Sequence, residues 1–287
     1  MRFCVLGSGS KGNCTLIESG ITSLLIDAGF SGKEITRRMA LINRSPEDLD
    51  AILITHEHGD HVSGAGVLSR RYKLPVYANP ATHQAAATRV KQLHQRWEFD
   101  TGTGFVVSDL DIHPFRTSHD TVDPVGFLIS DGVNSVAYCT DTGKITTLIR
   151  QRLRQCQALI LESNYDPAML LNGPYPMHIK QRVRSNHGHL ANNDAAAFLV
   201  ELCDTEVQHV MLAHLSETNN HPDLVMAQVQ QQLGNRARNF HLELARQDRP
   251  SRLITVGENK SEQKEGEGEE TISFQRQDGR GESCIRP

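Results

Sequence analysis

The sequence lacks several features that mark common classes of protein. Only 5% of its 287 residues are aromatic, so aliphatic side chains must fill most of any core. No apolar run approaches the ~20 residues of a membrane-spanning helix, and Met1 and Arg2 lead directly into a short strand pattern without a signal peptide. The six cysteines form no C-x-x-C pair, and most lie in apolar patterns, where a thiol behaves as a small hydrophobe. These absences favour a protein of the reducing cytosol.

A strong charge of either sign is also missing. The net charge is −4, and the segment from Gly257 onwards carries eight acids and five bases, which leaves the rest of the chain near −1. Bulk charge therefore does not indicate nucleic-acid binding, and any contacts with phosphates must come from local clusters. Residues 257–287 are rich in Glu, Lys, Gly, Ser and Gln, which predicts a disordered polar tail after one folded domain at residues 1–256.

The clearest positive signal is an apolar strand pattern that ends in three histidines and two acids. Residues 51–55 are mostly apolar and carry two isoleucines, and His-Glu-His-Gly-Asp-His follows at 56–61. The strand period of two places His56 and His58 on one side of the chain, while Asp60 and His61 follow at the junction with a helix. Imidazoles and a carboxylate delivered from a strand end suit Zn²⁺ or Mn²⁺. The stretch therefore predicts a metal site.

Other apolar strand patterns also end in an acid or an imidazole, at Asp27, Asp141, Glu162 and His214. Because ligands of layered α/β proteins gather at strand ends, we expect these residues to share one site with His56. His119 lies in a polar stretch after a predicted hairpin, and its position alone does not distinguish a metal ligand from a loop residue. The remaining histidines that we considered favour surface or packing roles: His83, His94, His113, His178 and His221.

A glycine-rich turn near the start imitates a dinucleotide-binding fingerprint. Gly7, Gly9 and Gly12 spell G-x-G-x-x-G, and Asp27 follows about 20 residues after the motif begins. That fingerprint needs a helix directly after the last glycine, whereas residues 14–18 have a strand pattern, so the sequence argues against dinucleotide binding. The turn is either an ordinary hairpin or a cradle for a phosphate, built from Ser8, Ser10, Lys11 and Asn13.

Taken together, His56, His58, Asp60 and His61 resemble the H-x-H-x-D-H signature of the metallo-β-lactamase superfamily. The resemblance extends over residues 1–256 and implies an αββα four-layer sandwich, an α/β fold, with two divalent metal ions. It implies that the first ion is bound by His56, His58 and His119, the second by Asp60, His61 and His214, and that Asp141 bridges them. It also implies that Asp27 does not bind a metal itself but orients one of the side chains that do. Zn²⁺ and Mn²⁺ both suit such ligands, and iron stays open.

Three further stretches resemble one branch of the superfamily, the YycJ (WalJ) subgroup. They are residues 7–13, Gly-Pro-Tyr-Pro at 173–176 followed by Lys180 and Arg182, and Gly-His-Leu-Ala-Asn at 188–192. The subgroup is regarded as 5′-to-3′ exodeoxyribonuclease-like. Glu162 and His189 resemble the acid and histidine that tRNase Z and RNase J enzymes use near the scissile phosphate. Tyr165 departs from the pattern, because a histidine is expected there.

The resemblance predicts a metal-dependent phosphodiesterase that acts on DNA. A hydroxide held between two ions would attack phosphorus, and Asp60 would help to orient this hydroxide. His189, held by Glu162, would protonate the leaving 3′ oxygen. Lys180, Arg182 and Arg184 form either a phosphate-binding cluster or a solvated basic face.

Two other functions stay open at this point. A small-molecule hydrolase, such as a thioesterase, lactonase or cyclic phosphodiesterase, would have a narrow closed pocket over the metals instead of a basic groove. A non-catalytic signalling or scaffold protein would need no intact ligand set, and the complete set argues against it. No oligomeric state is predicted from these residues.

Overall fold

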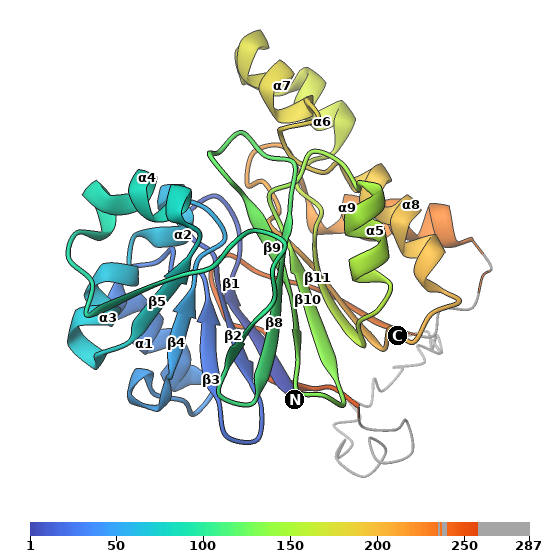
Figure 1. Cartoon of the computed structure of the whole chain (residues 1–287). Helices are drawn as coiled ribbons and strands as arrows, with labels where there is room; N and C mark the ends of the chain where they lie inside the picture. Colours follow the sequence, from blue (N-terminus) through green and yellow to red (C-terminus); the bar gives the residue numbers. More distant parts are fainter. Residues whose placement is uncertain (235, 237–239, 258–287) are drawn as a thin grey trace, which may run out of the picture. The chain divides into compact units, whose positions relative to one another are not determined.

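Two seven-stranded sheets form the centre of the protein (Figure 1). The computed structural model describes residues 1–234, 236 and 240–257. All of the predicted tail except Gly257 therefore lies outside the described residues. Residues Met1–Gly257 belong to one compact unit.

The first sheet has the strand order β14-β1-β2-β3-β4-β5-β6. Its strands β3 to β6 run parallel, so their carboxyl ends meet at one edge. The strands are β1 (Arg2–Gly7), β2 (Cys14–Glu18), β3 (Ser23–Ile26), β4 (Ala51–Leu53), β5 (Pro75–Ala78), β6 (Gln95–Glu98) and β14 (Ile254–Thr255).

The second sheet has the order β13-β12-β11-β10-β9-β8-β7. Strands β10 to β13 are parallel here, and their carboxyl ends again meet at one edge. The strands are β7 (Phe105–Val107), β8 (Leu110–Arg116), β9 (Val125–Ser130), β10 (Ser135–Cys139), β11 (Ala158–Glu162), β12 (His209–Ala213) and β13 (His241–Leu244).

Helices cover the outer face of each sheet (Figure 1). Those beside the first sheet are α1 (Gly32–Leu41), α2 (Gly59–Val62), α3 (Ala65–Tyr72) and α4 (Pro80–Val90), with a 3₁₀ turn η1 (Pro46–Asp48). Those beside the second sheet are α5 (Thr147–Leu153), α8 (Asn192–Leu202) and α9 (Pro222–Leu233). Side-chain caps fix several of the starts; for example, Ser31 accepts from Glu34 N at α1, and Asn79 accepts from Thr82 N at α4.

Three apolar clusters hold these layers together. The central one joins the two sheets through side chains such as Phe3, Ile26, Phe127 and Ile160. The second packs α5, α8 and α9 against their sheet, and the third packs α1, α3 and α4 against theirs. The order helix, sheet, sheet, helix confirms the predicted αββα sandwich. Because β3, β10, β11 and β12 are buried on both faces, they read as continuous apolar runs in the sequence.

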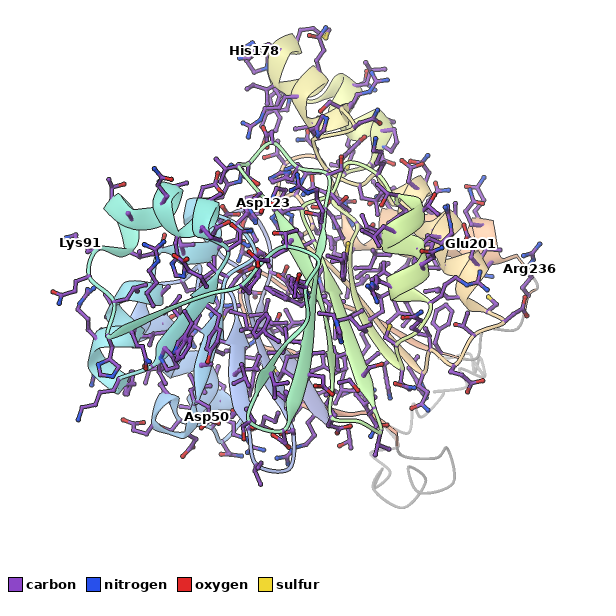
Figure 2. The ribbon with its side chains drawn as sticks, in the orientation of Figure 1. Asp50, Lys91, Asp123, His178, Glu201 and Arg236 are labelled. Atoms are coloured by element: carbon purple, nitrogen blue, oxygen red, sulfur yellow. The ribbon has the colours of Figure 1, made fainter. Side chains whose placement is uncertain are left out.

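Helices α6 (Pro167–Asn172) and α7 (Met177–Arg184) stand away from the sandwich at the top of Figure 1. None of the side chains of α7 is buried, and Figure 2 shows His178 at the outer end of this pair. Among the residues that the structure describes, no helix has both the length and the apolar character to cross a membrane.

Candidate metal centre

Three of the predicted site residues follow directly after a strand and share an unusual backbone conformation. Asp27 follows β3, Asp141 lies two residues after β10, and His214 follows β12, and their φ angles are 59°, 55° and 57°. Aspartate and histidine tolerate this left-handed region better than most residues, yet it is sparsely populated away from glycine. A left-handed residue turns the chain sharply, and here it turns three polar side chains into the same space. Such strain is typical of functional sites.

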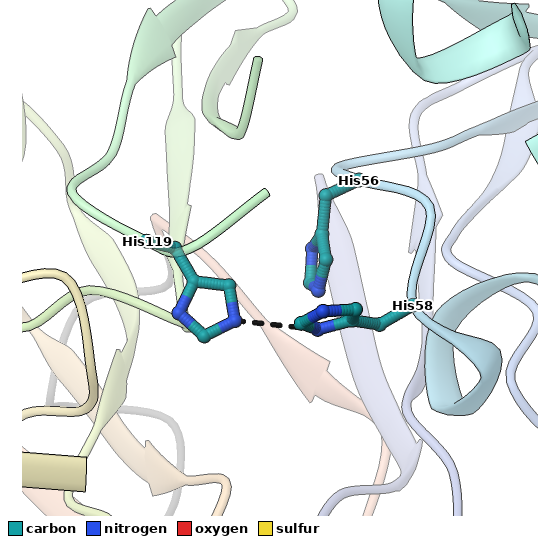
Figure 3. A group of neighbouring side chains, drawn as sticks. All are labelled: His56, His58 and His119. Atoms are coloured by element: carbon teal, nitrogen blue, oxygen red, sulfur yellow. Dashed lines mark hydrogen bonds between the residues drawn. The ribbon is translucent and has the colours of Figure 1, made fainter. Parts of the chain in front are cut away.

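His56, His58 and His119 converge on one point from two parts of the fold (Figure 3). The first two leave the end of β4, and His119 comes from the segment after β8. One nitrogen of each ring lies within 4.8 Å of the others, so the three can hold one ion. His119 Nδ1–H donates to the carbonyl of Gly188 at 3.0 Å, which leaves its Nε2 as a ligand atom.

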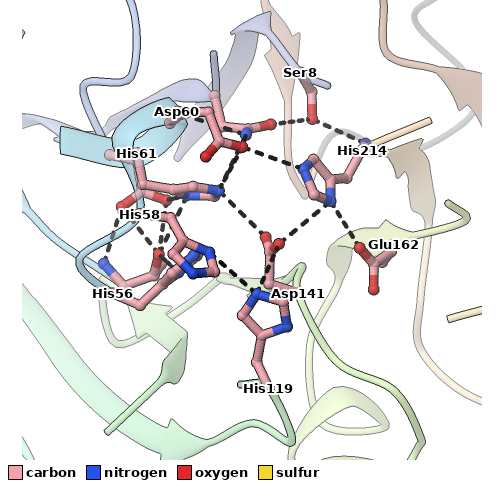
Figure 4. A network of polar contacts seen from close by, with 12 residues as sticks. Ser8, His56, His58, Asp60, His61, His119, Asp141, Glu162 and His214 are labelled. Carbon is pink, nitrogen blue, oxygen red and sulfur yellow. Dashed lines mark hydrogen bonds and ion pairs between the residues drawn. The ribbon is translucent and has the colours of Figure 1, made fainter. Parts of the chain in front are cut away.

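Asp60, His61 and His214 form a second group beside the first (Figure 4). Their potential ligand atoms also lie within 4.8 Å of one another. Asp141 lies between the groups, since its carboxylate oxygens are 3.4 Å from His61 Nε2, 3.6 Å from His119 Nε2 and 3.5 Å from His214 Nδ1. Asp141 thus lies close to histidine nitrogens of both groups.

Asp27 lies behind the second group and is fully buried. Its Oδ2 accepts from His61 Nδ1–H at 2.7 Å and from Thr55 Oγ1 at 2.9 Å. The Thr55 amide donates to Oδ1 at 2.9 Å, so one carboxylate fixes the ring of His61 and the end of β4 together. The Nε2 atom of His61 is thereby turned towards Asp60 and Asp141.

Glu162 occupies the corresponding place in the second sheet and holds two histidines. Its Oε1 accepts from His214 Nδ1–H at 2.7 Å and from His189 Nδ1–H at 2.9 Å. Its Oε2 accepts from the amides of Thr142 at 3.0 Å and Leu190 at 2.9 Å. The fully buried carboxylate therefore has a partner for each bonding direction, and the Nε2 atoms of both rings are left for other partners.

The glycine-rich turn is joined to this centre by Ser8 and Asn13. Asn13 Nδ2 is 3.3 Å from Asp60 Oδ2 and 3.1 Å from His61 Nε2, and its Oδ1 accepts from Ser8 Oγ at 2.8 Å. Ser8 Oγ in turn accepts from the His214 amide at 2.9 Å. Both belong to the turn that the sequence leaves open as a hairpin or a phosphate cradle. Asn13 is wholly buried and Ser8 almost so, and these polar atoms bond within the protein.

The electrostatics of the centre differ between its two groups. Burial lowers the pKa of His56 well below its usual value, and the neighbouring imidazoles of His61, His119 and His58 lower it further. A neutral imidazole is the form that binds a metal.

Burial would also lower the pKa of His214, but Asp141, Asp60 and Glu162 raise it to about 10. Carboxylates raise the pKa of His61 in the same way, against its own burial. Four carboxylates, those of Asp27, Asp60, Asp141 and Glu162, thus surround two imidazoles, which is an environment that attracts cations.

The polar atoms at the centre fit divalent metal ions. Three of the buried atoms without a hydrogen-bond partner in the described part of the chain belong to this centre: His56 Nε2, Asp141 Oδ2 and His214 Nε2. Buried polar atoms without partners are costly. Because all three can donate an electron pair, a bound cation would satisfy them. Nitrogen and carboxylate donors in this mixture suit Zn²⁺, Mn²⁺ or iron, and do not select among them.

The remaining predicted residues lie at the rim. Ser10 and Lys11 are exposed on the glycine-rich turn, and Lys11 Nζ pairs with Glu217 at 2.7 Å. On α7, Lys180 Nζ donates to the carbonyl of Leu171 at 2.7 Å, which directs it back towards α6. Arg182 pairs with Asp120, the neighbour of His119. Of these four side chains, Arg182 is thus joined most closely to the metal centre.

Two residues of the site were missed at the level of sequence. Thr55 bonds Asp27 and also lies 2.9 Å from His56 Nδ1, and Asp120 links Arg182 to the segment that carries His119. A hydroxyl directly before the first histidine and an acid directly after His119 were the available signals. Neither residue type is distinctive at such a place without the fold.

Comparisons with known proteins agree with this geometry. Residues 22–215 match the model of the beta-lactamase superfamily domain. The chain is 40% identical over 228 residues to the exodeoxyribonuclease WalJ of Streptococcus pneumoniae serotype 2 (strain D39 / NCTC 7466), covering 78% of this chain and 84% of that protein. It is 37% identical over 235 residues to the exodeoxyribonuclease YycJ of Bacillus anthracis, covering 81% and 89%. The crystal structure of the metallo-beta-lactamase fold protein YhfI from Bacillus subtilis superposes with a TM-score of 0.67 at 19% identity, covering 87% of this chain and 98% of that one.

Proposed function

Because the chain belongs to the β-lactamase superfamily and, within it, to the family of the exodeoxyribonucleases WalJ and YycJ, we propose that it is a metal-dependent exodeoxyribonuclease working from the 5′ end of DNA. The observation that carries this proposal is the bond of 2.9 Å between Glu162 and His189, directly beside the histidine and aspartate cluster. Hydrolysis of a phosphodiester needs both a centre that stabilises negative charge and a proton for the leaving oxygen. The site offers residues for both.

In this proposal two divalent ions are the cofactors. His56, His58 and His119 would hold the first, Asp60, His61 and His214 the second, and Asp141 would contact both. When bound, such ions lower the pKa of water to near 7 and offset the charge that develops on phosphoryl oxygens.

His189 has the role of general acid. Its Nδ1–H is committed to Glu162, so Nε2 is the nitrogen that can deliver a proton to the leaving 3′ oxygen. The carboxylate stabilises the protonated imidazole before transfer and fixes the direction of the ring. Asp60 bonds Asn13 and lies 3.5 Å from His61 Nε2, which positions its second oxygen to orient a nucleophile.

The rim supplies contacts to the DNA backbone. Ser10, Lys11, Lys180 and Arg182 are the candidates, and an arginine or lysine at such a position binds phosphate by a charge-assisted hydrogen bond. The cytosol, where DNA and reduced thiols are present, is the proposed location.

The experiment uses purified protein loaded in turn with Zn²⁺ and Mn²⁺ and supplied with end-labelled single- and double-stranded DNA and RNA. We expect mononucleotides to be released from the 5′ end of DNA, and no release after chelation. His189→Ala should keep its metal content and lose about 10²–10⁴-fold in rate, the range for general acid catalysis. His94→Ala, at an exposed histidine outside the site, is the matched control and should retain full rate. A metal-replete His189→Ala protein with undiminished rate would remove His189 from the mechanism.

A further inference from the structure

A second concave site lies behind the loop that carries His189. It is a pocket of about 380 Å³ between α5, α8 and the carboxyl end of α7. Its lining includes Lys144, Tyr165, Arg184, Asp194 and Phe198. Helices α5 and α8 lie on the outer face of the second sheet (Figure 1), and Glu201 of α8, which also lines the pocket, is labelled in Figure 2. We call this the side pocket.

The side pocket and the metal centre share a dividing loop, residues 186–190. On one face of this loop, Gly188 accepts from His119 and the His189 ring bonds Glu162. On the other face, Asn186 and Leu190 line the side pocket. A Cβ atom at Gly143, two residues after Asp141, would meet backbone atoms of Asn186 at 2.4 Å, so the segment after Asp141 packs directly against the loop. The two sites are thus one loop apart.

The charges of the side pocket are arranged for an anion. Arg150 is neutralised by Glu201, whose Oε2 lies 2.8 Å from its Nε. Lys144 and Arg184 have no ion-pair partner in the part of the chain that the structure describes. Two cations without partners at the mouth of a concave site attract phosphate, which arginine binds in a bidentate manner.

The remaining lining suits a nucleobase. Two aromatic side chains, Tyr165 and Phe198, line the pocket, and both are largely buried. Asp194 carries a carboxylate that can accept from an exocyclic amine of a base. A volume near 380 Å³ falls within the range of small-molecule sites and suits one nucleotide.

We propose that the side pocket binds the 5′-terminal nucleotide of the DNA substrate, with Lys144 and Arg184 on its 5′-phosphate and Tyr165 against its base. This inference rests on the proposed function. The nucleotide on the 5′ side of the scissile phosphate departs with the 3′ oxygen that His189 protonates, so it extends from the His189 side of the centre. The side pocket lies on the other side of the 186–190 loop from the bond between His189 and Glu162. A pocket with room for one nucleotide accounts for release of single nucleotides from the 5′ end, and Tyr165 becomes a residue that determines specificity.

The first test measures binding without catalysis. Metal-free full-length protein is titrated with deoxyadenosine 5′-monophosphate and with deoxyadenosine by calorimetry. The monophosphate should bind at least about tenfold more tightly, because two charge-assisted contacts depend on its phosphate. The double variant Lys144→Ala, Arg184→Ala should lose this preference, and Arg152→Ala, on α5 but outside the side pocket, should keep it. Equal binding of the monophosphate by wild type and double variant overturns the inference.

The second test uses the metal-loaded protein. Wild type should degrade 5′-phosphorylated DNA about tenfold or more faster than 5′-hydroxyl DNA, and the double variant should degrade both at the slower rate. Arg152→Ala, outside the side pocket, should keep both the wild-type rate and the wild-type preference. DNA degradation with an unaltered preference in the double variant overturns the inference and leaves the proposed function intact. Failure of wild type to degrade any DNA, with monophosphate binding intact, overturns the proposed function.

Tyr165→Leu tests the base contact, since it keeps apolar volume but removes the aromatic face. Affinity for the monophosphate should fall several-fold, within the range for loss of stacking on one base. An unchanged affinity in a variant with wild-type melting temperature contradicts the role given to Tyr165.

Discussion

Two buried carboxylates, one from each sheet, lie behind the metal centre and differ in the number of histidines that they hold. Asp27 follows β3 and accepts from one histidine, His61, while Glu162 ends β11 and accepts from two, His214 and His189. Both are completely buried. Asp27 therefore supports one proposed metal ligand, whereas Glu162 supports a proposed metal ligand and the proposed general acid with the same oxygen.

The surroundings of the two carboxylates explain how each stays in place. Burial raises the pKa of Asp27, although His61 and Thr55 oppose the shift. Burial would raise the pKa of Glu162 as well, but His189 and His214 hold it below the usual range. Glu162 thus has two imidazole partners where Asp27 has one, and only at Glu162 do the partners outweigh the cost of burial. In the proposed function, Glu162 is the residue that connects metal binding with proton transfer.

Glu162→Gln should have the largest effect, because it disturbs both functions at once. The amide keeps the shape of the carboxylate but removes the charge that stabilises His189 and orients His214. We expect a loss of about 10³–10⁴-fold in kcat/KM on DNA, as for loss of a general acid together with a metal-supporting residue. Steady-state kinetics with metal analysis of the same samples measures it. Excess metal should not restore the rate, and full recovery in excess metal would mean that Glu162 supports metal binding alone.

Asp27→Asn should have a smaller effect, and it should change metal affinity only. The variant loses the charge behind His61 but leaves His189 untouched, so metal affinity should fall about 10–100-fold, the usual cost of altering a residue that supports a metal ligand. Titration with Zn²⁺ or Mn²⁺, followed by activity and by bound metal, measures the change. Here saturating metal should restore most of the rate. If saturating metal does not restore the rate, Asp27 supports more than metal binding, and the proposed difference between Asp27 and Glu162 is wrong.

The same contrast decides how much of the site could be predicted from sequence. His56, His58, Asp60 and His61 of the first sheet lie within six residues, so their common purpose is visible without a fold. In the second half of the domain, the site residues are separated by about 20 to 30 residues and each looks ordinary alone. What identified them was the repeated pattern of an apolar strand ending in a polar residue, together with the family resemblance.

Other parts could not be predicted, for physical reasons. The left-handed conformation of Asp27, Asp141 and His214 could not be predicted from their residue types, because aspartate and histidine also occur in ordinary turns. Strand β6 has four exposed residues, Gln-Arg-Trp-Glu, and therefore no apolar pattern to reveal it. The αββα order was predicted, while the dividing loop and the side pocket depend on packing between segments distant in sequence.

Asn13→Ala should have the smallest effect, and it tests whether the two sheets are joined at the centre through the glycine-rich turn. Asn13 contacts Asp60 and His61 of the first sheet, and through Ser8 it reaches the His214 amide of the second. Removing its amide leaves partners unsatisfied in a buried place, which should cost about 1–3 kcal/mol of unfolding free energy. Asn79→Ala is the matched control, since Asn79 is equally buried but caps α4 away from the metals. Both variants should lose stability in denaturant titrations, but Asn13→Ala alone should also bind metal several-fold more weakly. Equal metal affinity in the two variants would show that the turn stabilises the fold without aligning the halves of the centre.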